Sequence, residues 1–369
     1  MATTTLINIL NLTPVELKDR FKALGLETYR TDQVLEWIYS KGVYDFDRMT
    51  NLSKELKDKL KASFVVSFPE EVREARSHED KSIKLLLKLN DKDLIETVYM
   101  SAAKLRAKSS TRPSARPTAP AENRHTVCVS SQVGCKFHCA FCASGQDGFF
   151  RNLSIGEIMA QILMARDLSP DKKISNIVFM GIGEPFDNYA ELLRTIRTLN
   201  AKKGLGLGAR KITISTCGII PKIESLSNEG LQVELSVSLH GATDRIRETI
   251  MPVNRAYPVK ELVDACKRYI KKTKRAITFE YILIKGINSS ERDARELSKL
   301  LKGMLCKVNL IPYNPIDEFP HDQPNYSDIV RFQQLLQDVG IRATVRFSKG
   351  RDIQAACGQL RSVMTKKNV

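Results

Sequence analysis

The stretch Cys135-Lys136-Phe137-His138-Cys139-Ala140-Phe141-Cys142 decides the fold, because it carries three cysteines with the spacing C-x3-C-x2-C. In a four-iron, four-sulfur cluster each iron takes a ligand. Thiolates from Cys135, Cys139 and Cys142 would therefore leave one iron open for a small molecule. A structural zinc site needs a fourth Cys or His at a matching interval, and His138 is too close to its flanking cysteines to supply one. The spacing predicts a [4Fe-4S] cluster rather than zinc or free thiols.

Strands and helices alternate after Thr126. Six strands are predicted, at Thr126–Ser130, Asn176–Gly181, Lys211–Thr216, Val233–Leu239, Ile277–Ile284 and Lys307–Pro312. Six such units predict an α/β fold with a parallel sheet and crossover helices, whose strand-end residues face one rim. The three-cysteine loop resembles that of the radical S-adenosylmethionine (SAM) superfamily, where the amino and carboxylate groups of SAM chelate the open iron. The resemblance implies a partial (β/α)6 radical-SAM barrel.

The charge balance points to a polyanionic partner. The chain has 369 residues, with 58 Lys and Arg against 42 Asp and Glu, a formal net charge of +16. A surface this positive favours nucleic acid as the partner over a merely soluble basic protein. The eight cysteines do not predict a disulfide framework, and reduced thiols with an oxygen-sensitive cluster predict a cytoplasmic protein. No uncharged apolar segment is long enough to cross a bilayer, so no membrane partner is expected.

Local signals divide the chain into parts. Three helices are predicted near the N-terminus. The first begins at the capping box Thr13-Pro14-Val15-Glu16, the second ends at Gly42 and the third begins at Ser53. Alternating apolar residues around the turn Asn90-Asp91-Lys92-Asp93 predict a β-hairpin. The predicted units are a helical, RNA-contacting accessory domain (1–80), a β-hairpin extension of the barrel (81–100), a flexible basic loop (101–125), the barrel (126–350) and a C-terminal segment (351–369).

Glu96 is an unusual residue of the hairpin, because it shares a strand face with Leu94, Val98 and Met100. On this pattern alone, an edge strand with Glu96 in water fits equally well.

Residues at or just past the strand ends are candidates for a pocket on the cluster rim. The turn Gly183-Glu184-Pro185 follows the second strand and can offer backbone groups to the ammonium of SAM. Further candidates are polar residues and one apolar neighbour, each of which could instead be a cap or a core residue: Ser215, Ser238, Leu239, His240 and Asn314.

Two more cysteines have positions that would let their thiols take part in the chemistry. Cys128 is on the strand that leads into the three-cysteine loop, and Cys357 has small neighbours that leave its sulfur open to approach. Cys217, Cys266 and Cys306 are predicted to be buried and inert.

These motifs together resemble the RlmN/Cfr-type family of RNA methyltransferases over nearly the whole chain. The resemblance rests on Cys128-Val-Ser-Ser-Gln-Val-Gly-Cys135, the cysteine triplet, the Gly-Glu-Pro turn, Ser238-Leu239-His240, Asn314 and Ala355-Ala356-Cys357-Gly358-Gln359-Leu360. It implies methylation of an adenine carbon, C2 for RlmN and C8 for Cfr. The overall likeness favours C2, in 23S ribosomal RNA at the peptidyl transferase centre and also in tRNA.

The resemblance also implies residue roles. Two SAM molecules are used per turnover, one to methylate Cys357 and one, bound at the cluster, to supply a 5′-deoxyadenosyl radical. The radical form of methylated Cys357 adds to adenine, Glu96 accepts the ring proton, and Cys128 attacks the sulfur of Cys357 to form a disulfide and release RNA. A lowered thiol pKa is expected to help Cys128. The implied SAM-binding residues are Gly183, Glu184, Ser215, Ser238, Leu239, His240 and Asn314. The implied electron donor is flavodoxin or ferredoxin. The enzyme is expected to be a monomer.

Two other classes of function fit the residues. One is a radical SAM enzyme that acts on a small molecule, and the other is a non-catalytic RNA-binding factor with a structural cluster. Neither of them needs Cys128 or Cys357.

Overall fold

The computed structural model describes residues 6–101 and 124–362, so nearly all of the predicted basic loop and the end of the predicted C-terminal segment lie outside the described residues. A ten-stranded mixed sheet has the order β14-β13-β12-β11-β10-β9-β6-β5-β4-β3. Its parallel part comprises β14 (Arg342–Val345), β13 (Cys306–Pro312), β12 (Ile277–Leu283), β11 (Glu234–Ser238), β10 (Ile212–Thr216), β9 (Asn176–Phe179) and β6 (His125–Cys128).

The six predicted strands of the barrel are confirmed, with ends that differ by one or two residues. The parallel strand β14 was not predicted. It lies at the edge of the sheet beside β13, and only Ala343 of its residues is buried. Four residues with one buried side chain carry too little apolar pattern to be recognised as a strand in the sequence.

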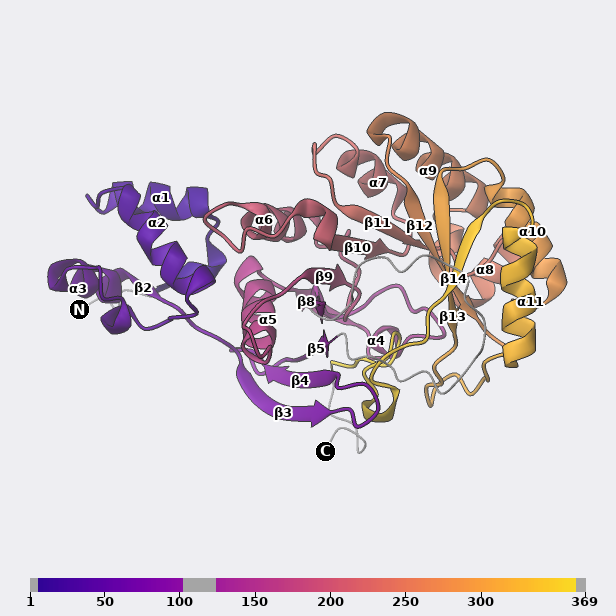
Figure 1. Cartoon of the computed structure of the whole chain (residues 1–369), viewed down its shortest axis with the longest axis horizontal. Helices are drawn as coiled ribbons and strands as arrows, with labels where there is room; N and C mark the ends of the chain where they lie inside the picture. The colour runs from indigo at the N-terminus through magenta and orange to yellow at the C-terminus, as the bar shows by residue number, and fades with distance from the viewer. Residues whose placement is uncertain (1–5, 102–123, 363–369) are drawn as a thin grey trace.

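Helices cover the sheet and are drawn on its outer side in Figure 1. They are α5 (Ile155–Asp167), α6 (Tyr189–Asn200), α7 (Ile220–Leu226), α8 (Asp244–Ile250), α9 (Val259–Thr273), α10 (Glu291–Leu301) and α11 (Tyr326–Gln337), with the short turns η5 (Ala209–Lys211), η6 (Pro252–Arg255) and η7 (Arg351–Ile353). The strands β7 (Gln132–Gly134) and β8 (Phe149–Asn152) form a small antiparallel sheet. The three-cysteine loop and α4 (Ala143–Gln146) connect these two strands.

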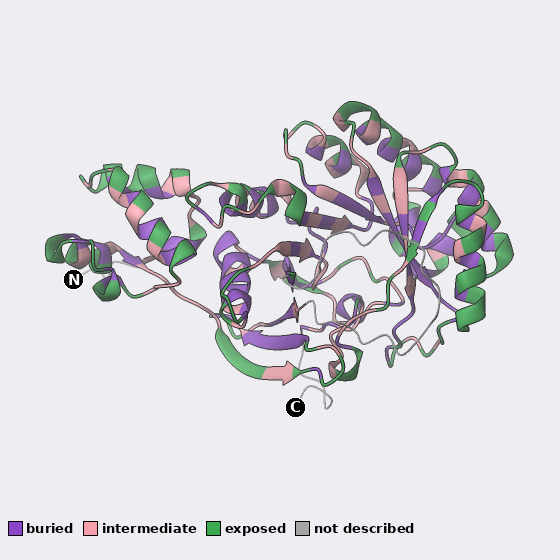
Figure 2. Ribbon diagram, in the orientation of Figure 1, coloured by how far each residue is buried: buried purple, intermediate pink, exposed green. Residues whose placement is uncertain are grey.

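Three antiparallel strands extend the barrel: β3 (Glu70–Arg76), β4 (Ile83–Lys88) and β5 (Leu94–Ser101). The β4–β5 pairing confirms the predicted hairpin. The third strand, β3, lies inside the range 1–80 that was predicted to be helical. Figure 2 shows β4 buried and β3 exposed. Because β3 is an edge strand built largely from Glu and Arg, its sequence lacks the apolar alternation of a half-buried strand.

The N-terminal part is the predicted helical unit, and Figure 1 shows it beside the barrel. Its elements are β1 (Ile7–Asn8), η1 (Ile9–Asn11), α1 (Pro14–Ala23), α2 (Tyr29–Leu35), the π-helical turn η2 (Glu36–Ser40), η3 (Phe46–Arg48), α3 (Lys54–Ser63) and β2 (Phe64–Val65). The predicted capping box is present, since Glu16 N–H donates to Thr13 Oγ1 and Thr13 N–H donates to Glu16. Ser53 Oγ accepts Leu56 N–H at 3.3 Å and caps α3.

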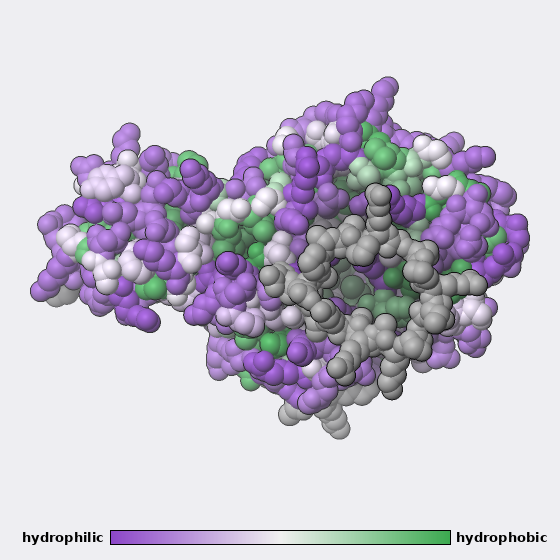
Figure 3. Space-filling view, in the orientation of Figure 1, coloured by the Kyte–Doolittle hydropathy of each residue, from purple (hydrophilic) through white to green (hydrophobic). Residues whose placement is uncertain are grey.

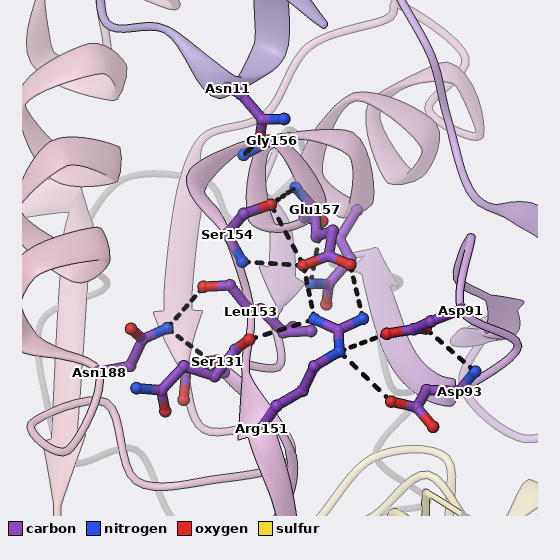
Figure 4. A network of polar contacts seen from close by, with 12 residues as sticks. Asn11, Asp91, Asp93, Ser131, Arg151, Leu153, Ser154, Gly156, Glu157 and Asn188 are labelled. Carbon is purple, nitrogen blue, oxygen red and sulfur yellow. Dashed lines mark hydrogen bonds and ion pairs between the residues drawn. The ribbon is translucent and has the colours of Figure 1, made fainter. Parts of the chain in front are cut away.

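A polar network centred on Arg151 of β8 fixes the hairpin relative to the cysteine loop (Figure 4). The Arg151 guanidinium contacts both carboxylate oxygens of Glu157 at the start of α5, at 2.8 and 3.0 Å. The same guanidinium contacts Asp91 at 2.5 Å and Asp93 at 3.3 Å in the β4–β5 turn. Asn11 of η1 accepts a hydrogen bond from Gly156 N–H, at 3.0 Å. The N-terminal unit, the hairpin and the cysteine loop are thereby joined to the same helix end.

The face of the molecule drawn in Figure 3 is mostly hydrophilic. Within the described ranges, no helix combines the length and apolar character that a membrane-spanning segment needs.

Candidate active site

The three-cysteine loop runs from β7 to β8 and is held by backbone hydrogen bonds. Cys135 N–H donates to Gly148 O at 2.7 Å, which closes the base of the loop. The C-terminal segment clamps its far side, where Ala143 N–H donates to Gly358 O and Ser144 Oγ donates to Leu360 O, both at 2.7 Å. Residues near opposite ends of the barrel sequence thus meet at one site.

The three thiols are half-buried neighbours that match the donor set of an iron–sulfur cluster. Burial raises the pKa of Cys135 to about 12, and it also raises the pKa values of Cys139 and Cys142. The thiols of Cys135 and Cys139 each lie within electrostatic reach of Cys142. Thiols this hard to ionise need a metal to become thiolates.

Three cysteines are the donor set of a cluster with one open iron. Within the described residues, no group of three or more His, Cys, Asp or Glu side chains is placed as the ligands of a metal ion. A cluster spreads its thiolates over different irons, whereas zinc draws its ligands together around one atom. His138 has a positive φ of 47° and its Nδ1 bonds to Gly145 O at 2.8 Å, so the ring shapes the loop.

The fold brings Cys128 and Cys357 together. Cys128 ends β6 and is buried, and the charge of Cys357 contributes to the rise in its thiol pKa. Cys357 is exposed to solvent, yet the surrounding protein raises its pKa to about 11, with smaller contributions from Glu280 and Cys142. The two candidate cysteines and the cluster loop share one site.

One expectation for Cys128 is wrong. A lowered thiol pKa was expected, but burial, the dominant cause, raises it, and the neighbouring Cys357 adds to the rise. An apolar setting disfavours the thiolate. This setting is made by Val98, Ile182 and Leu360, which pack against Cys128.

The remaining cysteines differ from one another. Cys266 is fully buried in the core, as predicted. Cys306 is only half-buried. Cys217 is buried, but it is not remote from the site, because the charges of Glu184 and Cys139 contribute to raising its pKa.

Glu96 is deeply buried, with 1% of its surface exposed, so it does not point into water. Its Oε2 accepts a hydrogen bond from Arg361 N–H at 2.9 Å, in the segment that carries Cys357. Its Oε1 lies 2.8 Å from Lys84 Nζ. Burial raises the pKa of Glu96, and the Lys84 ammonium opposes that rise. The carboxylate therefore sits beside the C-terminal segment with one cation next to it.

The Gly-Glu-Pro turn is rigid and tightly packed. Gly183 has φ +99°, and a Cβ there would lie 2.5 Å from Gln132 Cβ. The Glu184 carboxylate accepts backbone N–H groups from Phe186 at 2.9 Å and from Cys217 at 2.6 Å. The Glu184 side chain thus ties the end of β9 to the end of β10, and the Glu184 N–H donates to Gln132 Oε1 at 2.8 Å.

The other predicted SAM residues have different surroundings. Ser215 and Ser238 are half-buried on neighbouring strands β10 and β11. Asn314 is buried and donates to Ser348 Oγ at 2.8 Å and to Cys357 O at 3.2 Å, so it reaches the C-terminal segment. Leu239 packs in the core, and its backbone N–H and C=O bond to Glu280 and Arg247.

His240 is a neutral imidazole in this site. It is buried, and its backbone has a φ of +55°. Its ring packs edge to face against the ring of Phe141 in the cysteine loop, with the ring centroids 4.8 Å apart. Its Nδ1 accepts a hydrogen bond from Ile282 N–H at 3.0 Å. Burial lowers its pKa to about 3, helped by the charge of Arg247.

We expect this histidine to make folding stability fall at acidic pH. Because its folded-state pKa is depressed, its contribution is complete above the unfolded value near 6.5 and is lost as the pH falls towards 3. The unfolding free energy should drop by about 2 kcal/mol between pH 6.5 and pH 5, from 1.36 kcal/mol per pH unit. Denaturant unfolding at several pH values measures the slope. His240→Asn, whose Oδ1 can replace Nδ1 as acceptor, should flatten it; an unchanged slope would contradict the assignment.

Two buried charged residues near the site have no motif that would have identified them in the sequence. Arg247 of α8 is 0% exposed and donates to carbonyl oxygens of Cys217 at 2.6 Å, Leu239 at 3.1 Å and Tyr257 at 3.2 Å. It ties the ends of β10 and β11 to the helix behind them. Glu280 of β12 is 6% exposed and accepts a hydrogen bond from Asn309 Nδ2 at 3.1 Å.

Replacing Arg247 with Met should destabilise the protein by at least about 2 kcal/mol, because several buried carbonyls would lose their donor. Urea unfolding of the two proteins gives the difference. Arg245→Met is the matched control, since Arg245 is exposed on the same helix. Equal stability of the two variants would show that the bonds of Arg247 contribute nothing.

Comparisons with known proteins agree with this geometry. The family model of the ribosomal RNA large subunit methyltransferase N-terminal domain matches residues 7–66, and the radical SAM superfamily model matches residues 129–297. The probable dual-specificity RNA methyltransferase RlmN of Clostridium tetani is 45% identical over 363 residues, 98% of each chain. Its counterpart in Thermoanaerobacter sp. is 46% identical over 355 residues, 96% of this chain and 97% of the relative.

A solved structure is also similar over the whole fold. The crystal structure of a radical SAM methyltransferase from Sphaerobacter thermophilus has a TM-score of 0.88 and 43% sequence identity, and the match covers 97% of this chain and 100% of that chain.

Proposed function

This chain belongs to the RlmN family of radical SAM RNA methyltransferases, and from that premise we propose that it methylates C2 of an adenosine in 23S ribosomal RNA. The target lies at the peptidyl transferase centre, and an adenosine in tRNA is a second substrate. The observation that carries the proposal is the meeting of Cys128 and Cys357 beside Cys142 of the cysteine loop. A methyltransferase that moved the methyl group directly from SAM to RNA would need neither thiol.

Three residues of the chain carry the reaction in this proposal. Cys357 receives a methyl group on its sulfur and becomes joined to the adenine through that carbon. Glu96 accepts the proton that leaves C2, which suits a buried carboxylate with a raised pKa. Because a radical was added to the ring, one electron must also leave the adduct, and the cluster that Cys135, Cys139 and Cys142 would hold would accept it. The Cys128 thiol loses its proton and attacks the sulfur of Cys357, so that a disulfide forms as the bond from that sulfur to carbon breaks. The electron pair of the broken bond takes up a proton, which completes the methyl group on the released RNA.

Cys135, Cys139 and Cys142 would hold the [4Fe-4S] cluster, which with SAM supplies the radical that activates the S-methyl group. We propose two SAM molecules per turnover. The backbone of Gly183 and Glu184 lines the SAM site together with Ser215, Ser238, His240 and Asn314, and Leu239 positions its neighbours from the core.

We assign the remaining parts of the function as follows. The helical unit within residues 1–80 contacts RNA, aided by the net charge of +16, whose effect should weaken with salt. Flavodoxin or ferredoxin supplies electrons to a monomeric enzyme in the cytoplasm. The C-terminal segment from residue 351 presents the methyl-carrying thiol. Small-molecule and non-catalytic functions do not fit the family, whereas C8 methylation remains the alternative regiochemistry.

The test is anaerobic reconstitution with iron, sulfide, SAM and a reductant, followed by addition of a transcript of the peptidyl transferase centre. We expect 5′-deoxyadenosine and a nucleoside digest that contains 2-methyladenosine. A digest with 8-methyladenosine would establish the alternative, and 5′-deoxyadenosine without methylated RNA would overturn the proposed substrate.

A further inference from the structure

The Glu96 carboxylate forms a buried ion pair that the reaction described above does not by itself require. Lys84 Nζ lies 2.8 Å from Glu96 Oε1, and their side chains are 9% and 2% exposed. Lys84 also donates to Gln354 O at 3.1 Å, three residues before Cys357. Burying two charges is costly unless they are paired and hydrogen-bonded, as these are.

The strand register places this pair on the same face as the proposed resolving thiol. Lys84 of β4 lies directly opposite Val98 of β5, and Val98 lies opposite Cys128 of β6. Glu96 lies two residues from Val98 on β5, so it points to the same face. Lys84 and Glu96 therefore lie on the face of the hairpin that contacts the C-terminal segment and carries Cys128.

A cavity of about 370 Å³ adjoins the pair. It is lined by both side chains and by residues of β3, β4 and the C-terminal segment: Arg73, Ala75, Leu86, Asp352, Ile353 and Gln354. Arg73 and Asp352 are exposed, so the cavity extends from the buried carboxylate to the surface. Its volume is far larger than the roughly 30 Å³ that one water occupies in the liquid, and its walls combine apolar side chains with the polar groups of Lys84, Glu96 and Gln354, to which water can bond.

We propose that Lys84 is a positioning residue that keeps Glu96 ionised and aimed at the substrate, and that the cavity is the route by which the accepted proton reaches water. This inference rests on the proposed function. When the C2–H bond breaks, its electron pair stays with the ring and its proton goes to Glu96. The neutral acid no longer attracts Lys84 and passes the proton to water in the cavity, which restores the carboxylate.

The charges around Glu96 support this role for Lys84. Arg361 contributes its backbone N–H from the C-terminal segment. Its guanidinium pairs with Glu318 and Asp147, and its charge adds to that of Lys84 in opposing the rise in the pKa of Glu96. Arg73 and Asp352 lie at the exposed cavity wall with opposite charges. Among the described residues, Lys84 is the cation in direct contact with the carboxylate. Without it, burial would favour the protonated acid, which cannot accept a proton.

The experiment compares Lys84→Met with Lys88→Met, a control on the same strand whose lysine is exposed and pairs with Glu70. The substrate is the peptidyl transferase centre transcript deuterated at C2 of the target adenosine. In Lys84→Met we expect the single-turnover rate at pH 7 to fall by about 10- to 100-fold, within the range for a general base. The rate should recover as the pH is raised, with a larger deuterium isotope effect. Lys84→Arg should restore much of the rate.

Two readouts separate this inference from the proposed function. Methylated Cys357 and 5′-deoxyadenosine should form in Lys84→Met as in the unmodified protein, because those steps precede proton removal. If the unmodified protein forms no methylated Cys357, the proposed function fails. If it does, and Lys84→Met keeps the original pH profile and isotope effect, the role of Lys84 is overturned.

The exit route has its own test. Ala75 of β3 lies opposite Lys84 of β4, and Ala75→Phe would place a ring in the cavity and narrow it beside Lys84. We expect repeated turnover to slow by at least about fivefold while the first proton removal keeps its rate, since each cycle must clear a proton from Glu96. Unchanged repeated turnover would overturn the exit role. Thermal unfolding of each variant verifies that it is folded. If Lys84→Met is not folded, Lys84→Gln carries the test, because it removes the charge and keeps a side-chain N–H donor for Gln354 O.

Discussion

Cys128→Ala protein is expected to accumulate a covalent complex with RNA and to release almost no methylated product. The thiol of Cys128 lies within electrostatic reach of Cys357, at the end of β6. If it resolves the adduct, its removal blocks the last step alone. Single-turnover reactions should leave up to about one RNA per protein joined to Cys357, and multiple turnover should fall at least about 100-fold.

The adduct would be seen as a slowly migrating band on a denaturing gel that ribonuclease collapses, and peptide mass spectrometry would locate it on Cys357. The matched control is Cys266→Ala, a buried cysteine in the core away from the site. Free turnover by Cys128→Ala with no adduct would remove the main support for the thiol mechanism.

The raised pKa of Cys128 adds a pH dependence to this step. Since burial disfavours its thiolate, resolution of the adduct should speed up as the pH rises towards 9. The decay of adduct in the unmodified protein, followed after rapid mixing, measures this. A decay rate independent of pH would mean that another group deprotonates the thiol.

Cys357→Ala is expected to lose methylation altogether, by at least about 1,000-fold, because removing a covalent nucleophile leaves no route to the product. The side chain is exposed, and it contributes a backbone carbonyl, which alanine retains, to Asn314. The variant should therefore fold and assemble its cluster normally.

Iron and sulfide content, the cluster absorption spectrum and 5′-deoxyadenosine release test this separation of roles. Cys306→Ala, a half-buried cysteine on β13, is the control for loss of a thiol. Normal methylation by Cys357→Ala would contradict its role as methyl carrier, and loss of the cluster would mean that the thiol acts in assembly.

Much of the fold was predictable because its signals are local. The cysteine spacing, the helix starts at Thr13 and Ser53 and the six apolar strands each depend on residues close together in the chain, and the structure contains all of them. Edge strands were the exception. β3 and β14 bury few side chains, so hydrogen bonds to a neighbouring strand, rather than apolar pattern, create them.

The sequence by itself determined the donor set of the cluster loop and the residue types of the site. Only the tertiary structure decided how they act on one another. Burial makes the Cys128 thiol hard to ionise, Lys84 becomes the partner of Glu96, and Arg247 joins the ends of two strands. These properties depend on desolvation and on contacts between segments far apart in the chain. Both arise only when the strands pair and the C-terminal segment packs against them.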